Sequence, residues 1–189
     1  MDHNAHVLQN MAAIGPLDCK AAGCKGRETG GTSMTADPRP YMPKAQRTDW
    51  RTPPALFDKL AAEFGPFDLD PCGEHSSYAS QRCADYWTTG GMVLPWHGRV
   101  FVNPPYGRHL GLWVMKAVLS VQWGEATRVV ALLPARTEVK WWQRYVMHQS
   151  GPGDSCIQVA ALVRFLPGRL KFEGAKNAAP FPSVVVVWE

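Results

Sequence analysis

The stretch RVFVNPPYGRH, residues 99–109, contains the end of an expected strand and an unusual turn. An apolar run from Val100 to Val102 stops at Asn103, and two prolines and Tyr106 follow. The prolines remove two backbone donors and leave carbonyl oxygens free to accept hydrogen bonds. Asn103 adds a side-chain acceptor, and Tyr106 adds a flat aromatic face. Asn-Pro alone commonly forms a turn, but a turn requires neither the second proline nor the ring.

This group of acceptors suits a planar exocyclic amine. The side-chain oxygen of Asn103 and the carbonyl of Pro104 can accept the two amine hydrogens. The nitrogen lone pair is thereby drawn out of conjugation with its ring and directed at an electrophile. Pro105 completes the rigid turn, and Tyr106 can hold a base by stacking. A base within a duplex would first have to be flipped out of its helix.

Segments on both sides of the turn have the spacing of amphipathic helices. The first helix is expected to begin with Thr52 as its N-cap and Pro53 as its first helical residue. Further helices are expected over residues 109–123 and 138–149, with a short one around 78–87. The residues expected to face the core are Leu56, Leu60 and Phe64 in the first helix and Leu112, Met115 and Leu119 in the second.

Short apolar runs alternate with these helices, which predicts an α/β fold with a largely parallel sheet. Ligands of such sheets bind outside the carboxyl ends of the strands, where Asp70, Asn103 and Arg136 follow expected strands. Of the two acidic residues Asp68 and Asp70, only one is expected to face the site. Asp70 is favoured because it ends the strand. The expected strands cover residues 67–70, 99–103, 127–134, 157–172 and 183–189.

The length of 189 residues fits one domain. Residues 1–47 are rich in Gly, Thr, Ala and Pro and lack an apolar period, which predicts a disordered tail before a domain over 48–189. No run is apolar enough to cross a membrane, and the first residues lack the pattern of a secretion signal. A formal net charge of +4 permits a polyanionic partner.

The cysteines and histidines predict no metal site. Five cysteines at irregular spacings, without a Cys-x-x-Cys motif, favour reduced thiols in a cytoplasmic protein over a disulfide framework or a zinc site. The histidines also lack the spacing of metal ligands, so no metal is expected.

The NPPY motif at 103–106 resembles the signature of amino-group methyltransferases that use S-adenosylmethionine. The chain beyond the tail resembles the phage-type DNA adenine-N6 methyltransferase family over nearly its whole length. The motif alone also occurs in glutamine and RNA methyltransferases, whereas the ordered set of segments is more specific. The matching segments are TP at 52–53, FGPFDLDPC at 64–72, Trp96, VFVNPPYG at 100–107, LLPARTEVKWW at 132–142 and RFLPGRLKF at 164–172, followed by the last apolar run.

The resemblance implies a Rossmann-like methyltransferase fold with a largely parallel central sheet and a C-terminal antiparallel strand pair, trimmed in the middle. It also implies methyl transfer from S-adenosylmethionine to the N6 amine of adenine in DNA, in the cytoplasm of a bacterium or of a phage-infected host. No G-x-G loop follows Asp70, so Asp70 itself is expected to lie near the methionine end of the cofactor. The implied cofactor-binding residues are Trp50, Thr52, Pro53, Asp70, Pro71 and Asn103.

DNA is the expected partner, and little of the chain is left for a segment that reads a long sequence, which predicts relaxed specificity. Trp141 and Trp142 point in different directions on a helix, so only one is expected to contact DNA. A basic DNA face is expected within 148–180, although a solvated hairpin explains that segment equally well. Its basic residues are Arg164, Arg169, Lys171 and Lys176. The expected substrate-binding residues are Tyr106, Arg108, Arg136, Lys140 and Trp141.

Other functions remain open at this point. The N4 amine of cytosine in DNA presents the same chemistry as the N6 amine of adenine. An RNA amine or a protein glutamine is a further class of target, and an inactive DNA-binding module is a different class of function. Oligomeric state is not indicated by the sequence.

Overall fold

The computed structural model describes residues 50–147 and 160–189, so the tail expected over 1–47 lies outside the described residues. The described part contains a six-stranded mixed sheet in the order β2-β1-β3-β4-β6-β5. The strands are β1 (Leu69–Asp70), β2 (Asp85–Tyr86), β3 (Gly98–Val102), β4 (Ala126–Pro134), β5 (Leu162–Phe165) and β6 (Ser183–Trp188). The helices are α2 (Pro54–Phe64), α3 (Leu110–Gln122), α4 (Lys140–Tyr145) and a short 3-10 helix, η1 (Ser80–Arg82).

The first half of the sheet is parallel and the second half is antiparallel. β1 pairs in parallel with both β2 and β3, and β3 pairs in parallel with β4. β6 runs antiparallel to its two neighbours, β4 and β5. The antiparallel pair expected at the C-terminus is therefore confirmed, within a sheet that is mixed as a whole.

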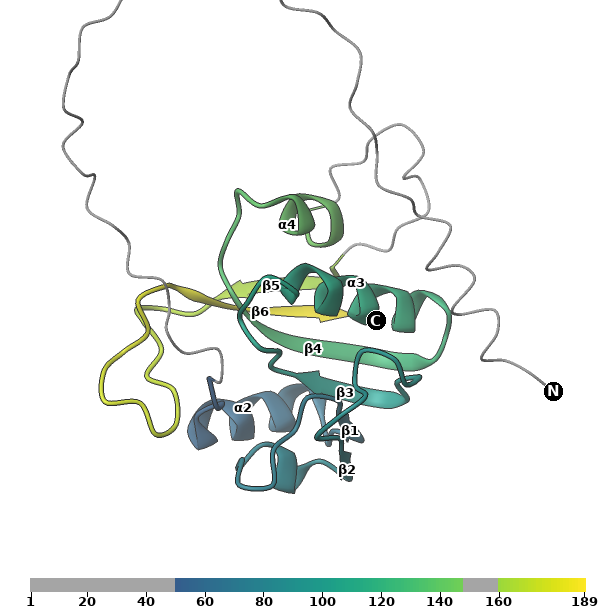
Figure 1. Cartoon of the computed structure of the whole chain (residues 1–189), viewed down its shortest axis with the longest axis horizontal. Coiled ribbons are helices and arrows are strands. Elements are labelled where there is room, and N and C mark those ends of the chain that lie inside the picture. Colours follow the sequence, from purple (N-terminus) through teal and green to yellow (C-terminus); the bar gives the residue numbers. More distant parts are fainter. Residues whose placement is uncertain (1–49, 148–159) are drawn as a thin grey trace, which may run out of the picture. The chain divides into compact units, whose positions relative to one another are not determined.

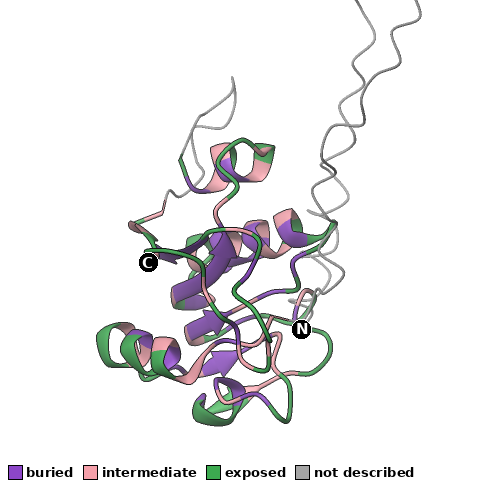
Figure 2. Ribbon diagram, turned by 90° about the vertical axis from the view of Figure 1, so that its left-hand side faces the viewer, coloured by how far each residue is buried: buried purple, intermediate pink, exposed green. Residues whose placement is uncertain are grey.

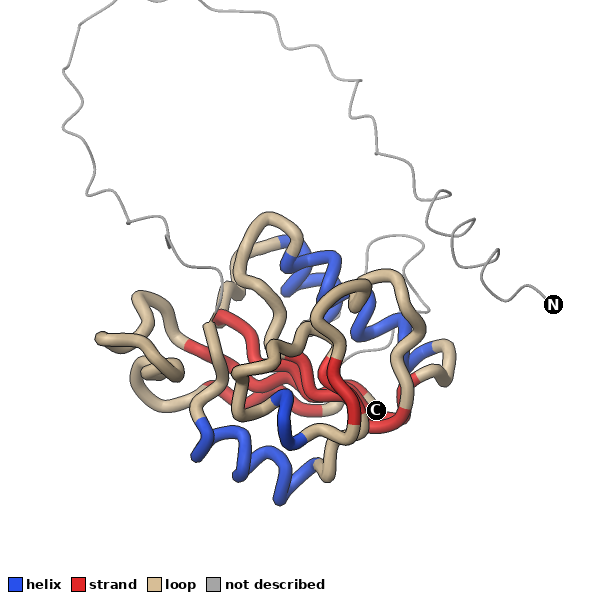
Figure 3. Tube along the Cα trace, turned by 60° about the horizontal axis from the view of Figure 1, so that its bottom comes forward, coloured by secondary structure: helices blue, strands red, loops and turns tan. Residues whose placement is uncertain are grey.

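Helices cover both faces of the sheet. α2 lies on one face, whereas α3 and α4 lie on the other (Figure 1, and in a second view Figure 3). Because both faces are covered, the central strands read as nearly continuous apolar runs. Figure 2 shows these strands as the most buried part of the chain.

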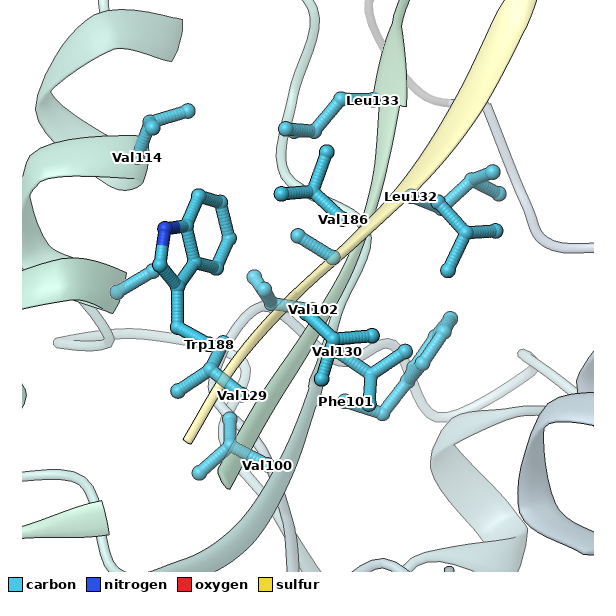
Figure 4. Packing of buried hydrophobic residues seen from close by; sticks show 14 of the residues in the cluster. Val100, Phe101, Val102, Val114, Val129, Val130, Leu132, Leu133, Val186 and Trp188 are labelled. Atoms are coloured by element: carbon cyan, nitrogen blue, oxygen red, sulfur yellow. The ribbon is translucent and has the colours of Figure 1, made fainter. Parts of the chain in front are cut away.

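Side chains of the central strands alternate between two cores. On one side of the strands, Val114 of α3 and Trp188 of β6 face each other, whereas Phe101 of β3 points to the other side (Figure 4). Phe101 packs there edge-on against Phe57 of α2, with ring centroids 5.1 Å apart. The indole N–H of Trp188 donates a 3.0 Å hydrogen bond to the carbonyl of Tyr145, which ties the last strand to α4.

Local details differ from the sequence predictions at the start of α2. The helix begins at Pro54, with Pro53 as its N-cap residue, and no side chain caps it. The prediction that Thr52 is the N-cap is wrong, because the Thr52 hydroxyl accepts a hydrogen bond from the Asn103 side chain instead. Leu60 is buried as predicted, but it is joined by Phe57, and Leu56 and Phe64 are only partly buried.

The predicted core face of α3 is also wrong. Leu112 is 43% exposed. The helix buries a different apolar stripe, on a neighbouring side of its axis. Because the helix is apolar on most sides, its sequence offers two stripes of equal periodicity. Trp141 of α4 packs against Gly111, so tertiary contacts decide between the stripes. The buried apolar residues are Leu110, Val114, Ala117 and Val118.

The short helix expected around residues 78–87 is replaced by the single turn η1 and the strand β2. The carbonyls of Asp68 and Asp70 accept hydrogen bonds from the backbone N–H groups of Asp85 and Trp87, both at 2.9 Å. Pairing with β1 therefore overrides the local helical pattern.

Two leucines of α3 provide a matched test of this packing. Leu110→Ala should lower the free energy of unfolding by about 2–5 kcal/mol, because Leu110 is 3% exposed and its loss leaves a cavity. Leu112→Ala should change it by about 0.5 kcal/mol or less. Urea unfolding followed by circular dichroism measures both, and a larger loss for Leu112→Ala would contradict the observed face of α3.

Candidate active site

The strand order reverses between β1 and β3, because β2 lies on one side of β1 and β3 on the other. Such a switch point is where open α/β sheets bind ligands, outside the carboxyl ends of the strands. Asp70 is the last residue of β1, and Asn103 follows the last residue of β3. A hollow of about 260 Å³ opens between them. Its lining includes Trp50, Thr52, Asp70, Cys72, Ser80 and Asn103.

Two hydrogen bonds fix the orientation of the Asn103 amide. Its Nδ2 donates to the carbonyl of Trp50 and, at 3.0 Å, to Oγ1 of Thr52. A carbonyl only accepts, so the NH₂ group must face Trp50 and the oxygen must face the other way. Oδ1 of Asn103 is buried and has no hydrogen-bond partner within the described segments. The amide therefore offers a free, pre-oriented acceptor beside the hollow.

Asp70 places a buried carboxylate in the same hollow. It is 4% exposed, and it accepts hydrogen bonds from the Ser80 hydroxyl at 2.8 Å and from the backbone N–H of Cys72 at 3.2 Å. Burial raises the pKa of Asp70, and these hydrogen bonds oppose that shift. No Lys or Arg between residues 50–147 or 160–189 forms an ion pair with it. The site therefore holds an acceptor suited to a cationic ligand.

Asp68 lies in a different environment. Its Oδ2 accepts hydrogen bonds from the backbone N–H of Arg99 at 2.7 Å and from Nε of the same residue at 3.4 Å. The backbone hydrogen bond from Arg99 is the main cause of its lowered pKa. Asp70, at the end of β1, lines the hollow, whereas Asp68 precedes the strand and does not line it.

Tyr106 does not present the open stacking face expected from the sequence. Its ring is 8% exposed, and its hydroxyl donates a 3.0 Å hydrogen bond to the carbonyl of Leu132. Phe172 and Phe181 lie against it, with ring centroids at 6.1 and 5.5 Å. Both come from the loop between β5 and β6, which Figure 1 shows beyond the ends of β3 and β4. This loop is the physical reason for the burial of Tyr106.

Sequence reasoning missed Phe172, Phe181 and the anchoring of the segment that precedes α2. Trp50 completes the aromatic group, with centroids 5.1 Å from Phe172 and 5.4 Å from Phe181. The carbonyl of Arg51 accepts a 2.9 Å hydrogen bond from the N–H of Glu173 in the same loop. The Arg51 guanidinium pairs with Glu74 beside the hollow. The contacts with Phe172, Glu173 and Phe181 join parts of the chain more than a hundred residues apart, and the Arg51–Glu74 pair spans 23 residues, so no local pattern signals them.

Pro53 and Pro71 adjoin the hollow without lining it. Pro53 is the N-cap residue of α2, directly after the lining residue Thr52. The carbonyl of Pro71 packs so closely on Gly91 that a Cβ there would lie 1.7 Å from the oxygen. Gly91 is therefore needed for the path of the chain after β1.

Exposed cations lie on the three loops that follow β3, β4 and β5. In residues 104–109, 135–140 and 166–182, six basic residues and two acidic ones give a formal charge of +4. Arg164, expected in the DNA face, instead forms a two-pronged ion pair with Glu63, at 2.6 and 2.5 Å. The exposed basic residues are Arg108, Arg136, Lys140, Arg169, Lys171 and Lys176.

The two tryptophans of α4 diverge as predicted. Trp142 is 1% exposed and lies in the core, and Trp141 is partly buried against α3.

In the part of the chain that the structure describes, no three side chains of metal-binding type cluster together. The helices of that part include none with the length and apolar character to cross a membrane.

The buried carboxylate predicts a pH-dependent gain in stability for Asp70→Asn. Because folding raises the pKa of Asp70, its ionised form destabilises the fold at a pH above that pKa. The amide can keep both hydrogen bonds, since the Ser80 hydroxyl accepts as well as donates. Asp70→Asn should raise the Tm at neutral pH, and the gain should vanish as the pH falls below the ordinary value of 3.8. A variant that is less stable than the parent at neutral pH would contradict this environment.

Residues 40–189 match the model of a protein family described as DNA N-6-adenine-methyltransferase (Dam). No curated protein and no solved structure matches the chain significantly.

Proposed function

Because the chain belongs to the DNA N-6-adenine-methyltransferase family, it is an enzyme that methylates the N6 amine of adenine in DNA, and we propose that its active site is the hollow between Asp70 and Asn103. This family does not favour cytosine, RNA or protein glutamine as the target, or a non-catalytic DNA-binding module. We further propose that S-adenosylmethionine is the methyl donor.

The strand order supports a shortened Rossmann-like methyltransferase fold. A doubly wound sheet has the order 3-2-1-4-5-6, and β2-β1-β3-β4 follows that order with its third strand left out. The short connection from β2 to β3, residues 87–97, stands where that strand and its helices would be. This short connection supports the proposal of a fold that is trimmed in the middle, as the family resemblance implies.

The chemistry of the hollow fits the amino acid end of the proposed cofactor. The carboxylate of Asp70 is buried and has no cationic partner within the described segments, so the ammonium group of a bound ligand can satisfy it. Trp50 and the backbone of Thr52 can contact the cofactor from the lining of the same hollow, and Pro53 and Pro71 lie next to them. When bound, S-adenosylmethionine supplies an electrophilic methyl group on a sulfonium sulfur.

The single observation that carries the proposal is the free, buried oxygen of Asn103. Oδ1 accepts one hydrogen of the adenine N6 amine, and the Pro104 carbonyl accepts the other. No backbone N–H of the described residues donates to that carbonyl. The two acceptors hold the amine in place and withdraw its lone pair from the ring. A positioned acceptor needs no reorganisation during the reaction, which is the basis of its catalytic effect.

Tyr106 holds the flipped base in this proposal, but its ring is covered by Phe172 and Phe181. Phe181 is partly buried, and Phe172 is 2% exposed. The loop that carries both rings must therefore shift when a base enters beside Asn103. Because this loop also carries Arg169, Lys171 and Lys176, contact with phosphates acts directly on it.

Asn103→Ala tests the proposed catalytic acceptor. Turnover should fall on the order of a hundredfold, because one positioned acceptor is lost. Affinity for S-adenosylmethionine, measured by calorimetry, should stay nearly unchanged. The assay is mass spectrometry of N6-methyladenine released from DNA, and Gln122→Ala, an amide at the end of α3, is the matched control. Native turnover of Asn103→Ala would place the catalytic site elsewhere. Methylation found by the same assay only in cytosine, RNA or protein would exclude adenine as the target.

The basic loops predict DNA binding that is dominated by phosphate contacts. Affinity should fall steeply as salt rises, and replacing Arg169, Lys171 and Lys176 together with Ala should reduce the slope of log K against log salt by up to about 2.7. Arg128→Ala, at the opposite end of β4, should leave that slope unchanged. Sequencing of methylated bases should find a short sequence context or none. A single long site of about six base pairs would contradict the proposed relaxed specificity.

A further inference from the structure

The side chain of Asn103 is held by hydrogen bonds to a segment that lies far from residues 103–106 in the sequence. Both of its N–H groups are bonded to the segment Trp50–Thr52, one to a backbone carbonyl and the other to the Thr52 hydroxyl at 3.0 Å. Thr52 is 2% exposed, so its hydroxyl cannot exchange freely with water. These contacts join positions 51 and 53 residues apart in the sequence.

We propose that Thr52 is a positioning residue, whose hydroxyl locks the amide of Asn103 so that Oδ1 faces the target amine. The inference rests on the proposed role of Asn103 and assigns Thr52 a role distinct from cofactor contact. The carbonyl of Trp50 fixes one N–H, but the torsion about the last bond of an asparagine side chain is broad and roughly two-fold. A second hydrogen bond from the NH₂ group narrows the range of this torsion angle. It also excludes the inverted amide, in which the NH₂ group would face the target amine.

Thr52 can serve as an anchor because its own position is fixed on both sides. Pro53 follows it and has a restricted φ of −61° as the N-cap residue of α2. Arg51 precedes it and pairs through its backbone with Glu173 in an antiparallel bridge. The Arg51 side chain binds Glu74, which also lines the hollow. The hydroxyl of Thr52 is thus part of a rigid support and not of a mobile chain end.

Three variants of the full-length protein separate positioning from cofactor binding. Thr52→Val keeps the shape of the side chain but removes the acceptor, and should lower kcat at saturating S-adenosylmethionine roughly five- to tenfold, as expected for one lost hydrogen bond. Thr52→Ser keeps the hydroxyl and should restore most of the turnover. Thr127→Val makes the same replacement at an exposed position in β4 and should leave kcat unchanged.

The Asn103→Ala background shows whether the effect passes through Asn103. Thr52→Val should cause no further loss of kcat there, because the amide that it positions is gone. The dissociation constant of S-adenosylmethionine, measured by calorimetry, should change less than about twofold in every Thr52 variant. Thermal unfolding of each variant confirms that the comparison is between folded proteins.

Each of the other outcomes overturns the proposal. A raised dissociation constant with unchanged kcat would make Thr52 a cofactor contact only. Native kcat for Thr52→Val, no rescue by Thr52→Ser, or an equal loss in the Asn103→Ala background would show that the hydroxyl does not act through the amide. None of these results would contradict the proposed function. The proposed function would be contradicted by a different result, native turnover of Asn103→Ala alone.

Discussion

A buried asparagine amide presents its oxygen to a target in one fixed orientation when its NH₂ group is bonded elsewhere in the protein. Several contacts of this structure meet that condition. The carbonyl of Trp50 and the hydroxyl of Thr52 accept hydrogen bonds from the NH₂ group of Asn103. Their segment must therefore lie across the end of β3, where the Arg51 contacts with Glu74 and Glu173 keep it. The loop after β1 and the loop after β5 thus hold the segment that carries both acceptors of the Asn103 amide.

The same site leaves buried polar groups incompletely satisfied. Oδ1 of Asn103 lacks a partner within the described residues, and Asp70 is a buried carboxylate with a raised pKa. Such groups destabilise a fold, and they are concentrated at functional sites. Strands β3, β4 and β6 offset this cost, because their central side chains are almost completely buried. The stable half of the sheet therefore supports a hollow arranged for ligands.

The sequence predicts the central strands and the two central residues of the candidate site, since each signal is local, but it does not predict β2. An apolar run that stops at Asn103 or Asp70 is visible within a few residues, and parallel strands bring both ends to one edge. The contact between Thr52 and Asn103 could not be predicted, because a Thr-Pro pair before a helix is explained completely by capping. The burial of Tyr106 was missed for a similar reason, since Phe172 and Phe181 reach it from a distant loop. In α3, two apolar stripes fit the same periodicity, and only packing against the sheet and α4 selects one.

The central claim, that Asn103 is a pre-oriented acceptor for the N6 amine of adenine, is tested most directly by a crystal structure of the full chain. The crystal should contain S-adenosylhomocysteine and an oligonucleotide with a flipped adenine. The account predicts that Oδ1 of Asn103 lies about 3 Å from N6, while Nδ2 keeps its bonds to Trp50 and Thr52. An adenine bound with N6 away from Asn103, or an inverted amide, would contradict it.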